Sequence, residues 1–367
     1  MRFLGWSTLA VTTALLLASA GETDGPTVDQ AADPAVERAV AVMDLRAEQW
    51  GRERRCVTCH TNGLALIAQP VAGSGRDEVE RTRQFAVAYL TGYTRGDRKP
   101  AGQHGSVTGL VATTAFLAMA DARLPQTPGG DRQAGSGEAV APSRGVAAAT
   151  REGLDHAWST LGESGTWDGW LRCNWPPFEA DLAFAPTLML VALGEVEERF
   201  GAGELSPRDR EGAAALQGWL RAHPPEGLHD RAMRVWAGVH FEGVGEAADL
   251  EAWRQELRDA QREDGGWPMG ALAADSWRHD SGRVQAEQSG AYATAFSLYV
   301  LLMAGAQADD GRVVRGKAWL REHQRPEGSW EDRSPRRDGR HFIGRAATAF
   351  AVMVLAMDGE GSGASGK

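Results

Sequence analysis

Internal repetition restricts the fold of this chain more than any other feature of its sequence. Amphipathic segments end in similar sequences, Trp-Leu-Arg-Ala-His at 219–223 and Trp-Leu-Arg-Glu-His at 319–323, and each leads into a Pro-Glu-Gly turn. Segments of small apolar residues with a shared Thr-Ala-Phe core occur at 109–116, 289–296 and 344–350. The segments with the Thr-Ala-Phe core are apolar nearly all round and must be buried. The segments that end in Trp-Leu-Arg have one apolar stripe and belong on an outer surface.

Hydrophobic periodicity and the Gly and Pro breaks pair these segments into about six helical hairpins. Strand signals are nearly absent, so we expect an all-α chain. The inner helices become buried only by curving round against one another. A closed α/α toroid achieves this without exposed ends, and an open α-solenoid is the alternative. The expected outer helices fall at 33–50, 76–93, 143–161, 208–223, 249–261 and 312–323, and the inner helices at 61–72, 105–121, 181–195, 231–243, 289–304 and 342–357.

Two of the turns resemble those of a known group of proteins. Gln261 precedes Gly-Gly-Trp at 265–267, and Gln324 precedes Gly-Ser-Trp at 328–330. These turns resemble the QW repeats of squalene–hopene cyclases and their prenyltransferase relatives, in which Gln and Trp tie an outer helix to the next inner helix. The resemblance implies an α/α toroid. It does not imply cyclase activity, because the Asp-x-Asp-Asp motif of the cyclases and the Asp-x-Cys zinc pair of the prenyltransferases are missing from the sequence.

A Cys-x-x-Cys-His sequence at Cys56, Cys59 and His60 indicates covalent attachment of one haem c. Two thiols at this spacing reach the two vinyl groups of one porphyrin, and the adjacent imidazole turns onto the iron from the proximal side. The chain also resembles exported bacterial proteins with squalene-cyclase-like repeats, which often carry this motif just before an inner helix. Here it falls in the first expected hairpin turn, at the mouth of the central cavity. The alternatives are zinc, with Cys173 or another His as a further ligand, a redox dithiol, and a Cys56–Cys59 disulfide.

A sixth iron ligand should come from the same rim of the ring. His104 precedes the second inner helix, and His341 precedes the sixth, which neighbours the first in a closed ring. Either side chain is a candidate for the sixth position, while His229 and His279 lie farther round. An iron with five ligands, open to a small molecule, is the other option and would favour catalysis or sensing over electron transfer alone.

A second group of candidate residues lies in a Trp-rich segment. Trp167, Trp170 and Trp175 precede Glu179 and Asp181. The aromatic side chains either cover the ends of inner helices or line a cavity in which the two carboxyl groups act as acids. Paired carboxyl groups do acid–base work when burial moves their pKa values apart. Glu179 and Asp181 are therefore the candidate catalytic residues if the chain is an enzyme without haem.

The first 20 residues have the form of a secretory signal. Arg2 is followed by an apolar stretch and by Ala-Ser-Ala at 18–20, where we expect cleavage; an uncleaved membrane anchor is the alternative. We therefore expect a periplasmic or otherwise extracytoplasmic protein without a transmembrane span after cleavage, with a toroid domain at 21–358 and a flexible tail at 359–367. The formal net charge of −10 argues against a nucleic-acid partner.

These features lead to three hypotheses from different classes. The main hypothesis is an extracytoplasmic haem c protein that exchanges electrons with a redox partner protein or performs haem-based redox chemistry. The second is a cyclase-like or glycan-processing toroid enzyme without haem. The third is a binding scaffold for a ligand or protein, and a hydrophobic small molecule in the central cavity is the candidate ligand.

Overall fold

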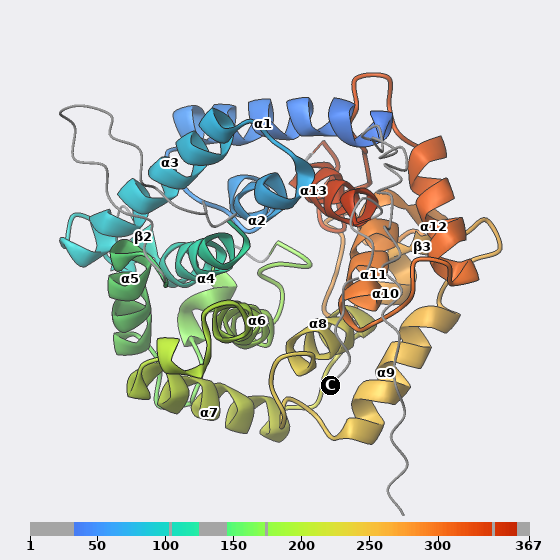
Figure 1. Cartoon of the computed structure of the whole chain (residues 1–367). Helices are drawn as coiled ribbons and strands as arrows, with labels where there is room; N and C mark the ends of the chain where they lie inside the picture. Colours follow the sequence, from blue (N-terminus) through green and yellow to red (C-terminus); the bar gives the residue numbers. More distant parts are fainter. Residues whose placement is uncertain (1–32, 103–104, 125–144, 173–174, 340–341, 358–367) are drawn as a thin grey trace, which may run out of the picture. The chain divides into compact units, whose positions relative to one another are not determined.

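Helices alternate between an outer and an inner layer along the described chain (Figure 1). The computed structural model describes residues 33–102, 105–124, 145–172, 175–339 and 342–357, so the expected signal at 1–20 and tail at 359–367 lie outside the described residues. The outer helices are α1 (Pro34–Arg54), α3 (Arg76–Thr94), α5 (Ala148–Ser159), α7 (Pro207–Ala222), α9 (Ala247–Asp259) and α12 (Gly311–Glu322). The inner helices are α2 (Asn62–Ala72), α4 (Val107–Arg123), α6 (Phe184–Phe200), α8 (Leu228–Gly238), α11 (Ala291–Met303) and α13 (Phe342–Ala356).

The two layers differ in how much of each helix is buried. In the outer helix α1, buried Ala39, Met43 and Ala47 recur every four residues and form one apolar stripe. In the inner helix α11, every residue from Ala291 to Leu301 is buried. A helix that is apolar on all sides needs neighbours on all sides. The inner layer meets this need by forming the core of the unit at 32–367.

The ring closes between its last and first hairpins. The inner helix α13 packs against both α11 and α2, and α1 also packs on α13. On the outside, Arg321 at the end of α12 forms an ion pair with Asp33 at 2.9 Å, and Gln324 Nε2 donates to the Ala35 carbonyl at 2.7 Å. The expected all-α toroid of about six hairpins is confirmed, and the open solenoid is not what forms.

The Gly-x-Trp turns connect the layers in the same way at successive positions. Trp267 Nε1 donates to the Leu257 carbonyl at 2.7 Å, and Trp330 Nε1 donates to the Leu320 carbonyl at 2.8 Å. Each indole thereby satisfies a carbonyl at the end of an outer helix that has no partner within the helix. The Trp267 backbone N–H also donates to Thr294 Oγ1 at 2.9 Å. The Thr of the shared Thr-Ala-Phe core therefore ties the turn to the next inner helix.

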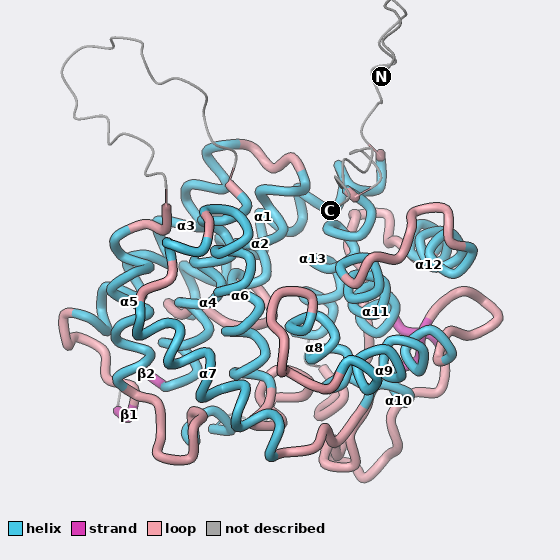
Figure 2. The backbone as a smooth tube through the Cα atoms, turned by 60° about the horizontal axis from the view of Figure 1, so that its bottom comes forward, coloured by secondary structure: helices cyan, strands magenta, loops and turns pink. Residues whose placement is uncertain are grey.

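The remaining described elements are short and lie in the connections. They are α10 (Met269–Leu272), two 3₁₀ turns (Asp168–Arg172 and Ala202–Glu204), the antiparallel pair β1 (Ala101–Gly102) with β2 (Gly105–Ser106), and the antiparallel pair β3 (Trp267–Pro268) with β4 (Ser289–Gly290). The β1–β2 pair lies at one end of the ring (Figure 2). We call this end, where the inner helices begin, the N-terminal mouth, and the end where they finish the C-terminal mouth. Among the described residues, no helix is long and apolar enough to cross a bilayer.

Candidate functional site

The Cys-x-x-Cys-His sequence lies in the turn between α1 and α2, at the N-terminal mouth. Arg55 ends α1 in the left-handed conformation, with φ 53°. Asn62 then holds the turn, because its Oδ1 accepts a hydrogen bond from Thr58 N and its Nδ2 donates to the Cys56 carbonyl, both at 3.0 Å. A Cβ at Gly63 would lie 2.5 Å from the Thr58 carbonyl oxygen, so only glycine fits there. The local sequence therefore fixes the backbone of this turn.

The two cysteines of the turn are thiols in different surroundings. Neither is in a disulfide, so the structure does not support the Cys56–Cys59 disulfide. Cys56 is half-buried, whereas Cys59 is only 2% exposed. Burial raises the pKa of the Cys56 thiol, although the Trp50 indole beside it opposes the shift. A raised pKa disfavours the thiolate that dithiol redox chemistry and zinc binding require.

His60 is enclosed by aromatic rings. Its ring centroid lies 5.1 Å from that of Trp50, 5.4 Å from Phe342 and 6.2 Å from Phe178. The Nδ1 atom lies 2.8 Å from Thr61 Oγ1, which fixes the orientation of the imidazole. Burial, together with the smaller effect of the Arg345 guanidinium, lowers the pKa of His60 to about 3. The imidazole is therefore neutral at physiological pH, which is the form that ligates a metal.

Ring contacts continue from His60 across the N-terminal mouth. Phe178 lies 5.8 Å from Tyr292, and Tyr292 OH is 2.9 Å from His229 Nε2. Trp175 lies 5.2 Å from Phe342, beside His60. The Trp-rich segment therefore does cover the ends of inner helices, since Trp170 stacks on Phe184, and its Phe178 also contacts His60 of the Cys-x-x-Cys-His turn.

The two candidate acids lie in this segment but in separate environments. Glu179 contributes to the electrostatic surroundings of Cys56. Asp181 Oδ1 accepts from the Phe184 backbone N–H at 2.9 Å at the start of α6. Burial raises the pKa of Asp181 to about 7, and the charge of Asp230 adds to this shift. The carboxyl group whose charge acts on Asp181 is that of Asp230, and no sequence pattern singled out this residue.

Asp230 and His229 are functional candidates that sequence reasoning missed or placed elsewhere. Asp230 forms a buried ion pair with Arg234, Nε to Oδ1 at 3.0 Å. His229 is 1% exposed, and its ring stacks 4.3 Å from Phe296. Burial lowers the pKa of His229 to about 3. The i, i+4 spacing of Asp230 and Arg234 was the available signal for the ion pair, but nothing in the spacing showed that it would be buried.

Some candidates for a sixth iron ligand lie outside the part of the chain that the structure describes. His104, His341 and the possible zinc ligand Cys173 lie outside the described residues. Of the more distant histidines, His229 bonds Tyr292 within the aromatic wall, and His279 Nδ1 lies 2.7 Å from Ser281 Oγ. In the part of the chain that the structure describes, no three His, Cys, Asp or Glu side chains are grouped to hold a metal ion.

The residues around Cys56 fit a haem in their chemistry. A hollow of about 580 Å³ borders Cys56 and is lined by the three basic residues Arg54, Arg55 and Arg98. Guanidinium groups are suited to the carboxylates that a haem carries. His60 has a neutral imidazole but does not line this hollow. Cys59 faces the core instead of the hollow. A porphyrin bonded to both thiols therefore requires the aromatic side chains around this turn to shift.

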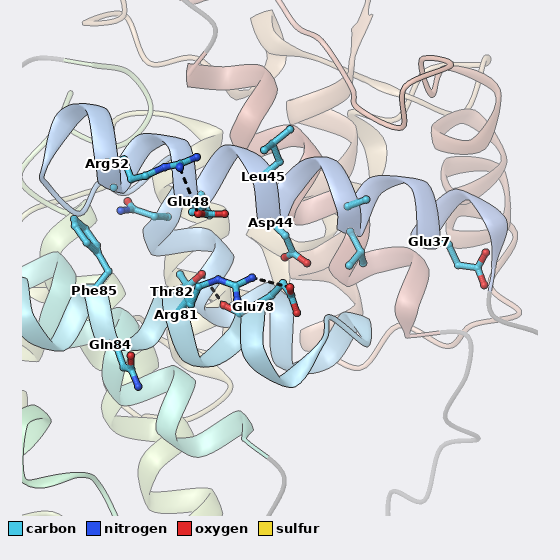
Figure 3. Close-up of a pocket in the computed structure, with 15 residues that line it drawn as sticks. Glu37, Asp44, Leu45, Glu48, Arg52, Glu78, Arg81, Thr82, Gln84 and Phe85 are labelled. Atoms are coloured by element: carbon cyan, nitrogen blue, oxygen red, sulfur yellow. Dashed lines mark hydrogen bonds and ion pairs between the residues drawn. The ribbon is translucent and has the colours of Figure 1, made fainter.

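A larger hollow, of about 760 Å³, lies between α1 and α3 on the outer wall (Figure 3). Its charged side chains are largely paired with one another, Arg81 with Glu78 at 2.7 Å and Arg52 with Glu48 at 3.8 Å. None of the candidate site residues lines it. Size alone therefore does not make it the functional site.

Comparisons with known proteins agree with this architecture. Residues 240–344 match the family model of the squalene–hopene cyclase C-terminal domain. A protein from Actinoplanes has a similar structure, with a TM-score of 0.50, 16% identity, and coverage of 88% of this chain and 97% of that chain. At this level of identity the likeness concerns the fold alone.

Two further solved structures are similar at lower scores. The type II terpene cyclase MstE from Scytonema has a TM-score of 0.47 and 14% identity, and the alignment covers 88% of this chain and 98% of that one. A glycosidase variant has a TM-score of 0.49 and 14% identity, over 88% of this chain and 95% of that one. No curated protein matches the chain.

Proposed function

We propose that this protein is a c-type haem protein on an α/α toroid scaffold, acting in electron transfer or haem-based redox chemistry. One observation carries the proposal: a turn at the N-terminal mouth, held by Asn62, places two cysteines and a neutral, oriented imidazole within five residues, with Cys56 at a hollow and Cys59 facing the core. The Cys-x-x-Cys-His order is that of covalent haem attachment. Haem bound there would supply an iron that changes its oxidation state by one electron or binds a small ligand.

Each residue of the turn has a role in this proposal. Cys56 and Cys59 would hold the porphyrin through their sulfur atoms, and His60 would bind the iron. Thr61 holds His60 by its Nδ1 and leaves Nε2 for the iron. Exposed Arg54 and Arg55 line the hollow beside Cys56 and would neutralise the carboxylates of a haem bound there. Haem c is attached outside the cytoplasm, so the proposal includes cleavage after residue 20, an extracytoplasmic location and a redox partner protein.

The visible spectrum of protein made in a host that attaches haem c tests this proposal. We expect a Soret band that persists after denaturation, and its loss in Cys56→Ser/Cys59→Ser. His60→Ala should change the ligand field of the iron, whereas His223→Ala, on the outer wall against Trp219, should leave the spectrum unchanged. A colourless wild-type protein from such a host would overturn the proposal.

Acid–base catalysis is the second candidate function, and the environment of Asp181 favours it. Its carboxyl group, at the N-terminal mouth, has a pKa of about 7, so it can hold and release a proton near neutral pH. The mouth is also walled by aromatic rings, which suit a hydrophobic small molecule. In this reading the protein needs no haem, and Asp181 is the acid.

Substrate screening with haem-free protein tests the second candidate. Polyprenyl and glycan substrates would be offered to Cys56→Ser/Cys59→Ser protein, and turnover should disappear in Asp181→Asn. The matched control is Asp309→Asn, which removes the same charge from an exposed position. Activity that survives Asp181→Asn would remove Asp181 from the role of acid.

A further inference from the structure

A long connection between α10 and β4 lies at the N-terminal mouth, and the haem proposal does not use it. We call residues 273–288 of this connection the strap. Its two ends are held together, because β3 pairs with β4 and the Gly270 backbone N–H donates to the Ala286 carbonyl at 2.8 Å. Compact surface loops whose ends lie this close are frequently functional. The strap is therefore a loop with a fixed base, and its tip is held by contacts with other parts of the ring.

One aromatic side chain of the strap covers part of the aromatic wall. Trp277 is only 4% exposed, and its ring centroid lies 5.4 Å from that of His229 at the start of α8. The His229 ring in turn stacks on Phe296 at 4.3 Å and on Phe184 at 6.3 Å. More than half of the other side chains of the strap are exposed, and Val284 is 83% exposed. Trp277 is thus the main apolar contact between the strap and the interior of the ring.

The contact between Trp277 and His229 leaves polar atoms unsatisfied. Trp277 Nε1 and His229 Nδ1 are both buried, and neither has a hydrogen-bond partner in the part of the chain that the structure describes. An indole N–H can only donate, so Trp277 needs an acceptor that the closed strap does not provide. Burying a polar group without a partner costs free energy, which hydration recovers. Opening the strap would hydrate both nitrogen atoms and would thereby offset part of the cost of exposing the indole ring.

Ion pairs join the tip of the strap to the loop that precedes α13. Asp280 Oδ2 lies 2.8 Å from Arg337 Nε, and Asp280 Oδ1 lies 3.5 Å from Arg336 Nε. The Asp280 backbone N–H also donates to the Arg336 carbonyl at 2.8 Å. In the opposite direction, Asp338 Oδ1 lies 2.8 Å from Arg283 Nη1. The paired side chains are 31–70% exposed, and ion pairs at such exposure are individually weak and are screened by salt.

We propose that the strap is a lid on the N-terminal mouth, which opens to admit an apolar small molecule to the aromatic wall and is held shut by its ion pairs with residues 336–338. The lid covers His229, which precedes Asp230, and the charge of Asp230 acts on the candidate acid Asp181. The inference rests on the second candidate function for the class of ligand, because aromatic walls suit hydrophobic molecules. Opening of the lid requires neither turnover nor haem.

Hydrogen exchange of the strap in the folded full chain, followed by mass spectrometry, tests whether the ion pairs hold it shut. Asp280→Asn removes the charge that Arg336 and Arg337 contact. At low salt we expect the strap amides of this variant to exchange roughly 2–5-fold faster than those of the wild type, as for the loss of exposed ion pairs. In about 0.5 M NaCl the wild type should exchange like the variant, because salt screens the ion pairs. Asp309→Asn, at an exposed position outside the strap, is the matched control and should exchange like the wild type.

Modification by diethyl pyrocarbonate, which reacts with accessible imidazoles, tests whether opening exposes the aromatic wall. His229 should react slowly in the wild type, faster in Asp280→Asn by the factor seen in hydrogen exchange, and faster still in Trp277→Ala. His223 is exposed on the outer wall and should react equally in all three proteins, so it is the internal standard. In Trp277→Ala protein the apolar probe anilinonaphthalene sulfonate should slow the reaction of His229 but not that of His223.

Three results would overturn the proposal. They are equal strap exchange in Asp280→Asn and wild-type protein at low salt, a His229 that stays unreactive in folded Trp277→Ala protein, and no protection of His229 by the probe. Circular dichroism of Trp277→Ala would show whether the ring is folded, and Asp280→Asn tests the lid without removing the indole. Neither measurement involves a substrate, so a failed search for turnover by Asp181 would leave these results unaffected.

Discussion

Asp181 illustrates how tertiary surroundings decide the chemistry of a single residue in this protein. Its place before α6 and its neighbouring aromatic residues were visible in the sequence. The effect of Asp230 on the pKa of Asp181 was not visible, because Asp230 belongs to a different hairpin and is buried with Arg234. The Cys-x-x-Cys-His turn is the opposite case. All of its parts are adjacent in sequence, so spacing alone identified the residues that the turn brings together.

The raised pKa of Asp181 predicts a specific pH dependence of stability. The folded-state value of about 7 lies above the ordinary value of 3.8, so the folded protein holds this proton more tightly than the unfolded chain does. The resulting stabilisation is fully present below about pH 4 and is lost as the pH rises through 7. Asp181→Asn should therefore lessen the fall in unfolding free energy between pH 4 and pH 8, measured by urea denaturation. Asp309→Asn should leave that fall intact, and equal profiles for both variants would contradict the prediction.

At the scale of elements, helices with a regular apolar pattern were predictable and a helix with buried charges was less so. The expected inner helix at 342–357 matches α13 (Phe342–Ala356), which is apolar throughout. The expected helix at 231–243 was misplaced, since α8 spans Leu228–Gly238. Its first turn contains His229 and Asp230, which look like loop residues in sequence. They are buried because the Asp230–Arg234 ion pair and the aromatic wall satisfy them.

The seam between α12 and α1 depends on close backbone contact at one glycine. Gly328 has φ 97°, and a Cβ there would lie 2.4 Å from the Arg38 carbonyl oxygen of α1. Gly305 has a similar φ of 88° with open space around it. Both alanine variants incur the roughly 1–2 kcal/mol cost of the left-handed conformation. Only Gly328→Ala also pushes the turn after α12 away from the Arg38 carbonyl of α1. We expect Gly328→Ala to be clearly less stable than Gly305→Ala in urea denaturation. Equal losses would show that the seam does not need this contact.

The whole molecule is a closed ring with two chemically different mouths. Repetition in the sequence predicted a closed ring, with an open solenoid as the alternative, because closure buries inner helices without polar faces and leaves no exposed ends. The Arg123–Glu195 ion pair at the C-terminal mouth was not predictable. The two residues lie on separate inner helices, and no spacing rule connects them. Only the converging helix ends, which carry partial negative charge, explain why a buried arginine is favoured there.

The Arg123–Glu195 pair should be strongly coupled in stability. Glu195→Gln leaves a buried guanidinium without its counter-charge, and we expect a loss of about 3–5 kcal/mol in unfolding free energy. Adding Arg123→Met removes that unpaired charge. The double variant should therefore lose less than the sum of the two single variants, as measured by a double-mutant cycle in urea. Strict additivity would mean that the pair does not act as a unit.

Haem attachment at the N-terminal mouth is the claim on which the functional account depends, and intact mass under denaturing conditions tests it most directly. Protein made in a host that attaches haem c should weigh one haem more than the signal-cleaved chain. The added mass should survive unfolding and should be absent from Cys56→Ser/Cys59→Ser protein. A wild-type protein with the mass of the bare chain, from a host that loads other c-type cytochromes, would contradict the account.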